Sequence, residues 1–277
     1  MQKMLTDVHT HSTFSFDGID TLDKMLETAH AKGVAFYGVS EHFNYDSCEE
    51  YVKQVPQDMD AEAYFHKARH LQDDYAGCMN VLVGAEFGYT EDETAQKKYL
   101  AVYEKYRPDF VVNSIHNTDG WDYYMASKTY YRADGTVKDK KQAYREYLQL
   151  VKQSLDAPYP YDIVGHIGYC IRYAPYDDAS ITLAEFGQEI DEILLGVIAR
   201  DKILEVNTNY KGGLCLPTEE MLRRYYQLGG RKVSFASDAH GVGRIMEKRE
   251  QIVTLLKEIG FTYITVPCKN EHIKVEI

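Results

Sequence analysis

Histidines close several short apolar segments of the chain, where their ring nitrogens could bind metal ions. A glutamate and an aspartate close two further segments, so that the candidate ligands are His9, His11, His42, Glu86, His116, His166, Asp238 and His240. A repeating strand–helix pattern brings all its strand ends together at one face of the molecule. We therefore expect these scattered imidazoles and carboxylates to form one site for more than one divalent metal ion.

Two pairs of these candidates are spaced two residues apart. Residues i and i+2 of a strand point to the same side, so His9 and His11 should face one cavity, as should Asp238 and His240. Asp7 stands two residues before His9, where it would either fix a histidine tautomer or simply begin the strand. A mixture of imidazole and carboxylate ligands suits Zn, Mn or Fe better than Mg or Ca.

The remaining candidate ligands stand at single strand ends or in a loop. Glu86 lies between two glycines in GAEFG, and a carboxylate there could bridge two cations. Glu41 and His42 are adjacent, so they should face opposite sides of their strand, and we predict that His42 is the ligand. Asp17, in the loop STFSFDG, is either a ligand or a turn-forming residue.

Charged and polar residues near the strand ends are candidates for contacting a substrate. Arg172 in GHIGYCIRY is suited to gripping a phosphate with two parallel hydrogen bonds, and Lys211 offers a second positive charge. Asn207 could cap the following loop or orient a substrate, and the sequence leaves both possibilities open. The loop carboxylates Asp119 and Asp122 could attract a cationic group.

The elements that must position these residues alternate between strand and helix. Apolar runs predict strands at residues 4–9, 35–40, 80–85, 110–114, 163–166, 203–207 and 232–236, with a possible eighth at 263–266. Helical periodicity lies between them, at residues 21–32, 61–75, 95–106, 140–155, 182–200, 218–228 and 244–259. This alternation favours a single-domain (β/α) barrel over residues 1–277. Long segments at 43–60 and 117–139 should carry substrate contacts.

Composition excludes several classes of protein. The 277 residues carry a formal net charge of −12, which argues against binding a nucleic-acid backbone. No window approaches 18 apolar residues, so we expect no membrane span. The five cysteines form no CxxC pair, and we interpret them as reduced thiols of a cytoplasmic protein. The oligomeric state cannot be deduced from the sequence.

The segments HTH, EH, GAE, SIH, GH and SDAH resemble, in this order, the motifs of the PHP (polymerase and histidinol phosphatase) family over nearly the whole chain. The pieces EHF, SIHNTDGWDY, GHIGYCIRY and EVNT are similar to those of its histidinol-phosphate phosphatases. The resemblance implies a distorted (β/α)7 barrel with three divalent metal ions at the C-terminal strand ends. It assigns one ion to His9, His11, Glu86 and Asp238, a second to Glu86, His116 and His166, and a third to Asp17, His42 and His240.

The same resemblance implies hydrolysis of L-histidinol phosphate to L-histidinol and phosphate, a step of histidine biosynthesis. We predict that Asp238, Arg172 and His240 are catalytic, and that the substrate also contacts Lys211, Asn207 and Asp119. Asp238 is one candidate for protonating the leaving group, and a metal-bound water is another. The alternatives are a PHP-type phosphoesterase acting on nucleotides or other small phosphomonoesters, a C–N hydrolase of the amidohydrolase type, and a catalytically inactive regulatory protein.

Overall fold

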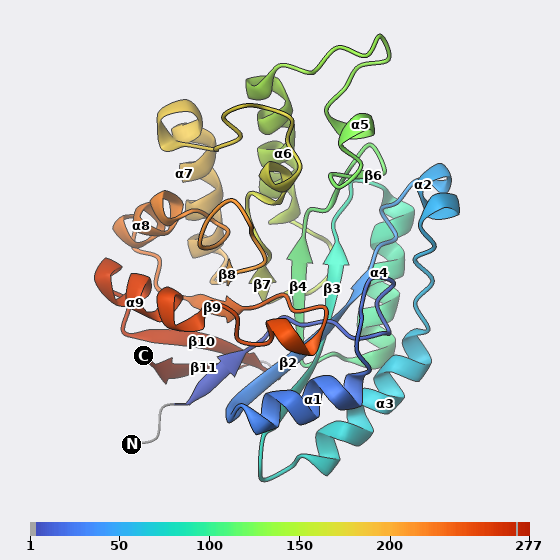
Figure 1. Ribbon diagram of the computed structural model, residues 1–277, viewed down its shortest axis with the longest axis vertical. Helices are drawn as coiled ribbons and strands as arrows, with labels where there is room; N and C mark the ends of the chain where they lie inside the picture. Colours follow the sequence, from blue (N-terminus) through green and yellow to red (C-terminus); the bar gives the residue numbers. More distant parts are fainter. Residues whose placement is uncertain (1–3, 270) are drawn as a thin grey trace.

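Seven of the apolar segments form one parallel sheet in the computed structural model, which describes residues 4–269 and 271–277 (Figure 1). The strands are β1 (Leu5–Asp7), β2 (Val34–Phe43), β3 (Asn80–Gly88), β4 (Phe110–Ser114), β7 (Ile163–Val164), β8 (Ile203–Asn207) and β9 (Val233–Ala236). They are hydrogen-bonded in the order β1-β2-β3-β4-β7-β8-β9. The sheet therefore follows the chain order, as the alternating pattern predicts.

Backbone contacts just beyond β9 and β1 nearly close this sheet into a barrel. The Val8 amide donates to the Phe235 carbonyl at 3.2 Å, and the Asp238 amide donates to the His9 carbonyl at 2.9 Å. Thr10 also forms an isolated parallel bridge with Ala239. The predicted barrel of seven parallel strands is confirmed, and its closure depends on the segments that carry His9 and Asp238.

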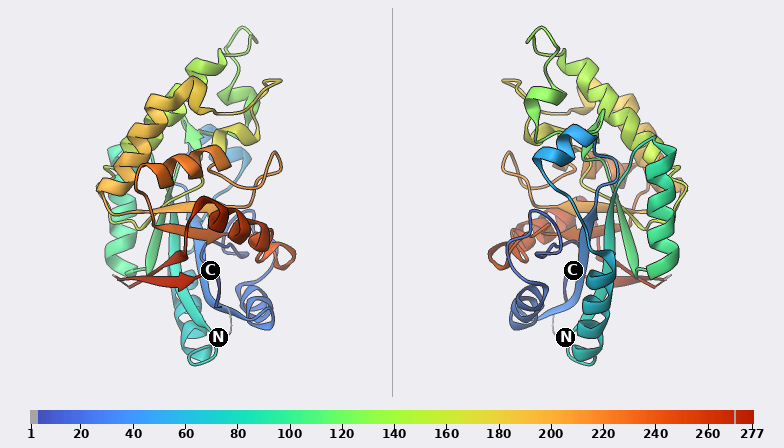
Figure 2. Two further views of the ribbon diagram at one scale, coloured as in Figure 1. Left: turned by 90° about the vertical axis from the view of Figure 1, so that its left-hand side faces the viewer. Right: turned by 90° about the vertical axis from the view of Figure 1, so that its right-hand side faces the viewer.

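Helices pack around the outside of the strands, and the side views show α6 and α7 lying next to each other along one flank (Figure 2). The longer helices are α1 (Leu22–Ala31), α3 (Ala61–Asp74), α4 (Glu93–Tyr106), α6 (Lys140–Ser154), α7 (Leu183–Ala199), α8 (Glu219–Gln227) and α9 (Arg249–Ile259). Side chains of Thr21, Asp60, Asp92, Asp139 and Thr182 accept a hydrogen bond from a backbone amide three residues further along, which fixes where five of these helices begin.

The C-terminal part differs from the expectations in where one helix begins and in where one strand lies. The helix expected from residue 244 begins at Arg249, because Val242–Arg244 form a 3-10 helix and Lys248 has a left-handed φ of 57° that interrupts the helical path. The possible eighth strand is present as part of β10 (Tyr263–Cys268), but it pairs antiparallel with β11 (Glu271–Glu276) in a separate sheet and does not extend the barrel. This hairpin buries Val266 and Val275 against apolar strand residues of the barrel.

The two long segments expected to carry substrate contacts have secondary structure of their own. The first contains α2 (Glu49–Gln54), and the second contains the hairpin β5 (Asn117–Thr118) and β6 (Trp121–Asp122) followed by α5 (Ala126–Thr129). The Cys48 amide donates to the Gly120 carbonyl at 2.8 Å and so joins the two segments. Across residues 4–269 and 271–277, no helix combines the length and apolar character that crossing a membrane requires.

Candidate active site

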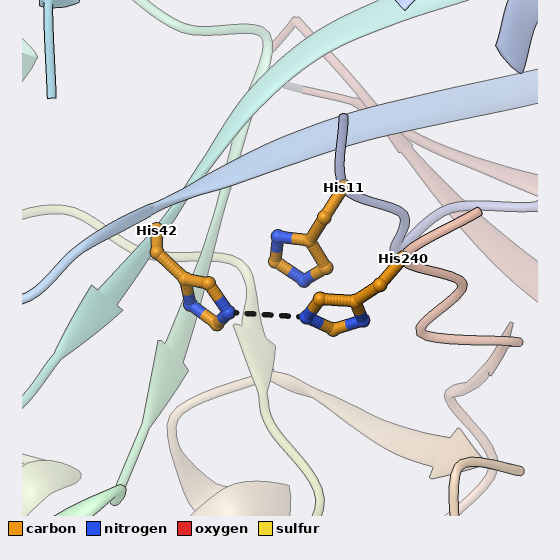
Figure 3. A group of neighbouring side chains, drawn as sticks. All are labelled: His11, His42 and His240. Carbon is orange, nitrogen blue, oxygen red and sulfur yellow. Dashed lines mark hydrogen bonds between the residues drawn. The ribbon is translucent and has the colours of Figure 1, made fainter. Parts of the chain in front are cut away.

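The eight strand-end candidates and Asp17 converge at the C-terminal ends of the strands. Ligand atoms fall into three groups within which all lie 4.8 Å or less apart: His9, His11 and Asp238; His42, Glu86 and His116; His11, His42 and His240. Figure 3 shows the rings of the third group turned toward one another from three separate segments. Since His11 and His42 each belong to two groups, the groups form one continuous cluster.

Ring nitrogens in this cluster face each other in pairs. The two Nε2 atoms are 3.0 Å apart in His9 and His11, 3.2 Å apart in His116 and His166, and 3.4 Å apart in His42 and His240. Two neutral imidazole nitrogens that both present lone pairs repel one another, and a cation between them removes the repulsion. Three such pairs in one pocket fit the donor set of a metal cluster.

Glu86 occupies the centre of the cluster and is completely buried. Its Oε1 lies 3.2 Å from His116 Nε2 and 3.0 Å from His166 Nε2, whereas its Oε2 lies 3.4 Å from His9 Nε2 and 2.8 Å from His42 Nδ1. Oε2 is buried and has no hydrogen-bond partner. The carboxylate thus presents one oxygen to each side, as a ligand that bridges two cations would do.

Asp17 and Asp238 complete the anionic part of the cluster. Asp17 Oδ2 lies 3.2 Å from His240 Nε2, so this loop residue stands beside the third group. Asp238 Oδ1 lies 3.3 Å from His11 Nε2, and its backbone has a left-handed φ of 49°. Burial acts to raise the pKa of Glu86 and Asp238, but the surrounding imidazoles hold both well below their usual range. Ionised carboxylates are the form that binds metal.

Glu205, on β8, is a buried member of the site that the sequence reasoning missed. Its Oε1 lies 2.5 Å from His9 Nδ1, and its Oε2 accepts from the His166 amide at 2.7 Å. Burial acts to lower the pKa of His9, but the carboxylates of Glu205 and Glu86 raise it well above its usual value. A glutamate inside the buried strand sequence ILEVN was the signal that could have revealed this role.

Asn207 contacts two carboxylates of the cluster and does not line the cavity. Its Nδ2 donates to Glu205 Oε2 at 3.1 Å and to Asp238 Oδ2 at 3.2 Å. Its Oδ1 accepts from the Asn209 amide at 2.8 Å, which caps the following loop. The sequence left open whether Asn207 caps the following loop or orients a substrate. The structure shows the loop cap, together with a hydrogen bond to Asp238 that was not expected.

Two other acidic residues face away from the metal ligands. Asp7 accepts from the amides of Ser237 and Met246 at 2.9 and 3.0 Å, so it holds the segments after β9 rather than a histidine. Glu41 accepts from the hydroxyls of Ser12 and Ser15, each at 2.6 Å. Glu41 and His42 therefore face opposite sides of β2, as the alternation of a strand requires.

A cavity of about 730 Å³ opens over the cluster. Arg172 lines it, with Nη1 4.0 Å from Asp238 Oδ2 and the guanidinium 5.0 Å from the centre of the Tyr169 ring. Lys211 and Asp122 line it as well, and Asp122 Oδ1 accepts from the Tyr169 hydroxyl at 3.3 Å. Asp119 lies elsewhere, in a neighbouring cavity of about 520 Å³.

Comparison with known proteins gives this site a family. The sequence model of the PHP domain family matches residues 7–209. The chain belongs to the PHP domain family. A curated relative named probable histidinol-phosphatase, from Clostridium acetobutylicum, is 30% identical over 241 residues, which are 86% of this chain and 87% of the relative. The histidinol-phosphatase of Lactococcus lactis is 27% identical over 259 residues, covering 92% of this chain and 91% of the relative.

Solved structures share the fold. The histidinol phosphate phosphatase of Lactococcus lactis, complexed with zinc, L-histidinol and phosphate, superposes with a TM-score of 0.85 at 25% identity and covers 99% of this chain and 100% of that one. A putative histidinol phosphatase from Listeria monocytogenes superposes with a TM-score of 0.75 at 23% identity, covering 89% of this chain and 99% of that one, and supports the barrel alone.

Proposed function

We propose that the protein is a metal-dependent phosphomonoesterase that hydrolyses L-histidinol phosphate to L-histidinol and phosphate in histidine biosynthesis. One observation carries the proposal: a cluster of imidazoles and carboxylates lies beside Arg172 at the floor of one cavity. The Lactococcus lactis relative, similar over nearly the full chain, is complexed with zinc, L-histidinol and phosphate. Cations around the oxygens of a phosphate ester neutralise the charge that develops as the phosphoryl group is transferred.

The cluster would hold three divalent ions, with zinc, manganese or iron as the candidate metals. His9, His11 and Asp238 would hold the first, and His116 and His166 the second, with Glu86 shared between them. Asp17, His42 and His240 would hold the third. The paired ring nitrogens and the partnerless oxygen of Glu86 support this division, and zinc in the Lactococcus lactis relative supports the metal type.

Bound metals would supply positive charge to the phosphoryl oxygens and lower the pKa of a water toward neutrality. The protein's own part is to orient the ester. Arg172 is mostly buried, with 17% of its side chain exposed, and its guanidinium can donate hydrogen bonds to the phosphorus-bound oxygens on which charge develops. Asp238 lines the cavity and its Oδ2 accepts hydrogen bonds from Asn207 and Asn209, so that it stays one candidate for protonating the leaving alkoxide, beside a metal-bound water.

The cationic amine and imidazole of L-histidinol phosphate need a counter-charge in the cavity. Of the two carboxylates Asp119 and Asp122, it is Asp122 that lines this cavity, and only 6% of the residue is exposed. Burial raises the pKa of Asp122, and a cation beside it would favour the ionised form. We therefore assign the amine contact to Asp122, since Asp119 faces the neighbouring cavity. Lys211, at the exposed rim, would add positive charge near the phosphate.

Turnover of defined substrates tests the proposal. The metal-reconstituted protein should release phosphate from L-histidinol phosphate with a higher kcat/KM than from a panel of nucleoside monophosphates, sugar phosphates and phosphoserine. Faster hydrolysis of nucleotides would instead identify another phosphoesterase of the family. Absence of phosphate release from every ester, with metal bound, would reject the phosphatase and favour the regulatory or C–N hydrolase alternatives.

Arg172→Ala tests the role of the guanidinium. We expect kcat/KM to fall roughly 30- to 1,000-fold, because Arg172 would contact the transition state. This fall corresponds to a loss of about 2–4 kcal/mol of transition-state stabilisation. Arg145→Ala is the matched control, since Arg145 pairs with Glu189 on the outer helices and is exposed. Equal activity of the two variants would remove Arg172 from the site.

Three further expectations stay predictions: a single domain over residues 1–277, a cytoplasmic location and the absence of nucleic-acid binding.

A further inference from the structure

We propose that Lys248 is a positioning residue that holds loop 208–213 as one wall of the active cavity. Its ammonium group donates to three backbone carbonyls of this loop, those of Thr208 at 3.4 Å, Tyr210 at 2.7 Å and Gly213 at 3.0 Å. The carbonyls lie on both sides of Lys211, so one cation closes the loop beneath the residue at its tip. An ammonium group has three protons to donate, and each has an acceptor here.

The backbone of Lys248 is shaped for this contact. It has a left-handed φ of 57° immediately before α9, a conformation that residues other than glycine rarely adopt without a compensating contact. Two neighbours reinforce the same contact surface: the Glu247 carbonyl accepts from the Thr208 hydroxyl at 3.0 Å, and Arg244 Nη1 donates to Asn209 Oδ1 at 2.6 Å. Segment 244–248 therefore contacts the loop through three of its five residues: the side chains of Arg244 and Lys248 and the carbonyl of Glu247.

The loop forms part of the cavity wall and contacts the metal-ligand cluster. Asn209, Tyr210, Lys211 and Gly212 line the cavity, and Asn209 Nδ2 donates to Asp238 Oδ2 at 3.1 Å. The ring of Tyr210 lies so close over Gly212 that a Cβ there would be 2.4 Å from the tyrosine oxygen. A loop folded this tightly moves as a unit, so the contacts of Lys248 determine where Lys211 and Asn209 stand.

Loss of the ammonium should loosen the loop while leaving the metal ligands in place. Three carbonyls would lose their common donor, but Asp238 would keep its hydrogen bond from Asn207. The expected consequence is weaker binding of the phosphate ester with little change in the chemical step. This kinetic consequence rests on the proposed phosphatase function, whereas the mobility of the loop does not.

The experiment compares Lys248→Met with Lys257→Met, which removes an exposed lysine from the last turn of the same helix α9. Limited digestion of the metal-loaded protein with trypsin reports on the loop, because the enzyme cleaves after Lys211 only when this segment opens. We expect cleavage after Lys211, followed by mass spectrometry, to become about tenfold faster in Lys248→Met and to stay unchanged in Lys257→Met. The thermal midpoint should fall by only a few degrees.

Kinetics provide the second readout. In Lys248→Met we expect KM for L-histidinol phosphate and the inhibition constant of inorganic phosphate to rise about 5- to 10-fold, with kcat within about threefold of the parent value. Lys248→Arg keeps a cationic donor and should recover at least part of the loss in both assays. Recovery by arginine would show that the donated hydrogen bonds, and not the side-chain volume, position the loop.

Three outcomes would overturn the proposal. Equal cleavage after Lys211 in the methionine variants of Lys248 and Lys257 would show that the ammonium does not hold the loop. Faster cleavage with unchanged KM and phosphate inhibition would show that the loop does not position substrate. A general rise in cleavage at all sites, with a large fall in thermal midpoint, would make Lys248 a residue of overall stability. If no variant or parent protein hydrolyses the ester, the proposed function fails while the trypsin comparison still decides whether Lys248 holds the loop.

Discussion

Replacing Glu205 by glutamine should weaken metal binding without changing any residue of the predicted ligand set. The completely buried carboxylate of Glu205 contacts His9 Nδ1 and the His166 amide. His9 lies beside Oε2 of Glu86 and His166 lies beside Oε1. A charged acceptor on an imidazole holds its orientation and raises its basicity as a ligand. Glutamine preserves the shape of the side chain but removes the charge.

The structure sets the size of this effect. A hydrogen bond to a charged group contributes about 1.5–3 kcal/mol and a neutral one about 0.5–1.5 kcal/mol, so the exchange should cost roughly 1–2 kcal/mol of metal affinity. At about 1.4 kcal/mol per factor of ten, the affinity for zinc should fall about 5- to 30-fold. The amide nitrogen of glutamine also faces the donating His166 amide or the His9 ring, which moves the effect toward the upper end.

The assay is titration of the metal-free protein with zinc against a competing indicator. Glu219→Gln is the matched control, because Glu219 is exposed on α8 and pairs only with Arg223 among the contacts of the described residues. The midpoint of unfolding of each metal-free variant, measured in parallel, separates lost affinity from lost folding. Zinc affinities of Glu205→Gln and Glu219→Gln that agree within twofold would refute the reasoning.

Two further predictions concern the metals and the opposite end of the barrel. Removal of metal with a chelator should abolish phosphate release and lower the thermal midpoint of unfolding, because the buried ligands lose the cations that they bind. Added zinc or manganese should restore both, and an unchanged thermal midpoint after chelation would contradict this prediction. Asp109→Ala should destabilise the protein by roughly 2–4 kcal/mol in urea unfolding while leaving KM unchanged, since the buried Asp109 accepts from Arg69, Gln72 and the Val83 amide. A variant as stable as the parent would show that these contacts contribute nothing.

The sequence predicted the barrel and the convergence of the ligands because both depend on local patterns. The expected bounds of β4 and β8 agree with the structure, since each is a short buried run that begins directly after a charged residue, Asp109 or Lys202. β2 and β3 extend beyond their apolar runs, to Phe43 and Gly88, so His42 and Glu86 lie within strands rather than after them. Polar ligands at a strand end hide the end of the strand from a hydrophobicity pattern.

Features set by tertiary contacts escaped prediction. A glutamate in the buried strand ILEVN is a signal, but the partner that explains it, His9, is 196 positions away in the chain. The 3-10 turn and the left-handed Lys248 before α9 form where loop 208–213 packs against them, and the helical pattern of the segment conceals the break. The β10–β11 hairpin lies outside the parallel sheet and packs against apolar residues of strands distant in the chain, which no local pattern of residues 263–266 could indicate.

Anomalous diffraction from crystals of the protein grown with zinc, collected on both sides of the zinc absorption edge, tests the central claim most directly. We predict three strong peaks at the C-terminal end of the barrel, one next to each ligand group, with Glu86 between two of them. Maps without any peak at these imidazoles, from crystals that contain zinc in their mother liquor, would contradict the metal centre on which the proposed phosphatase chemistry depends.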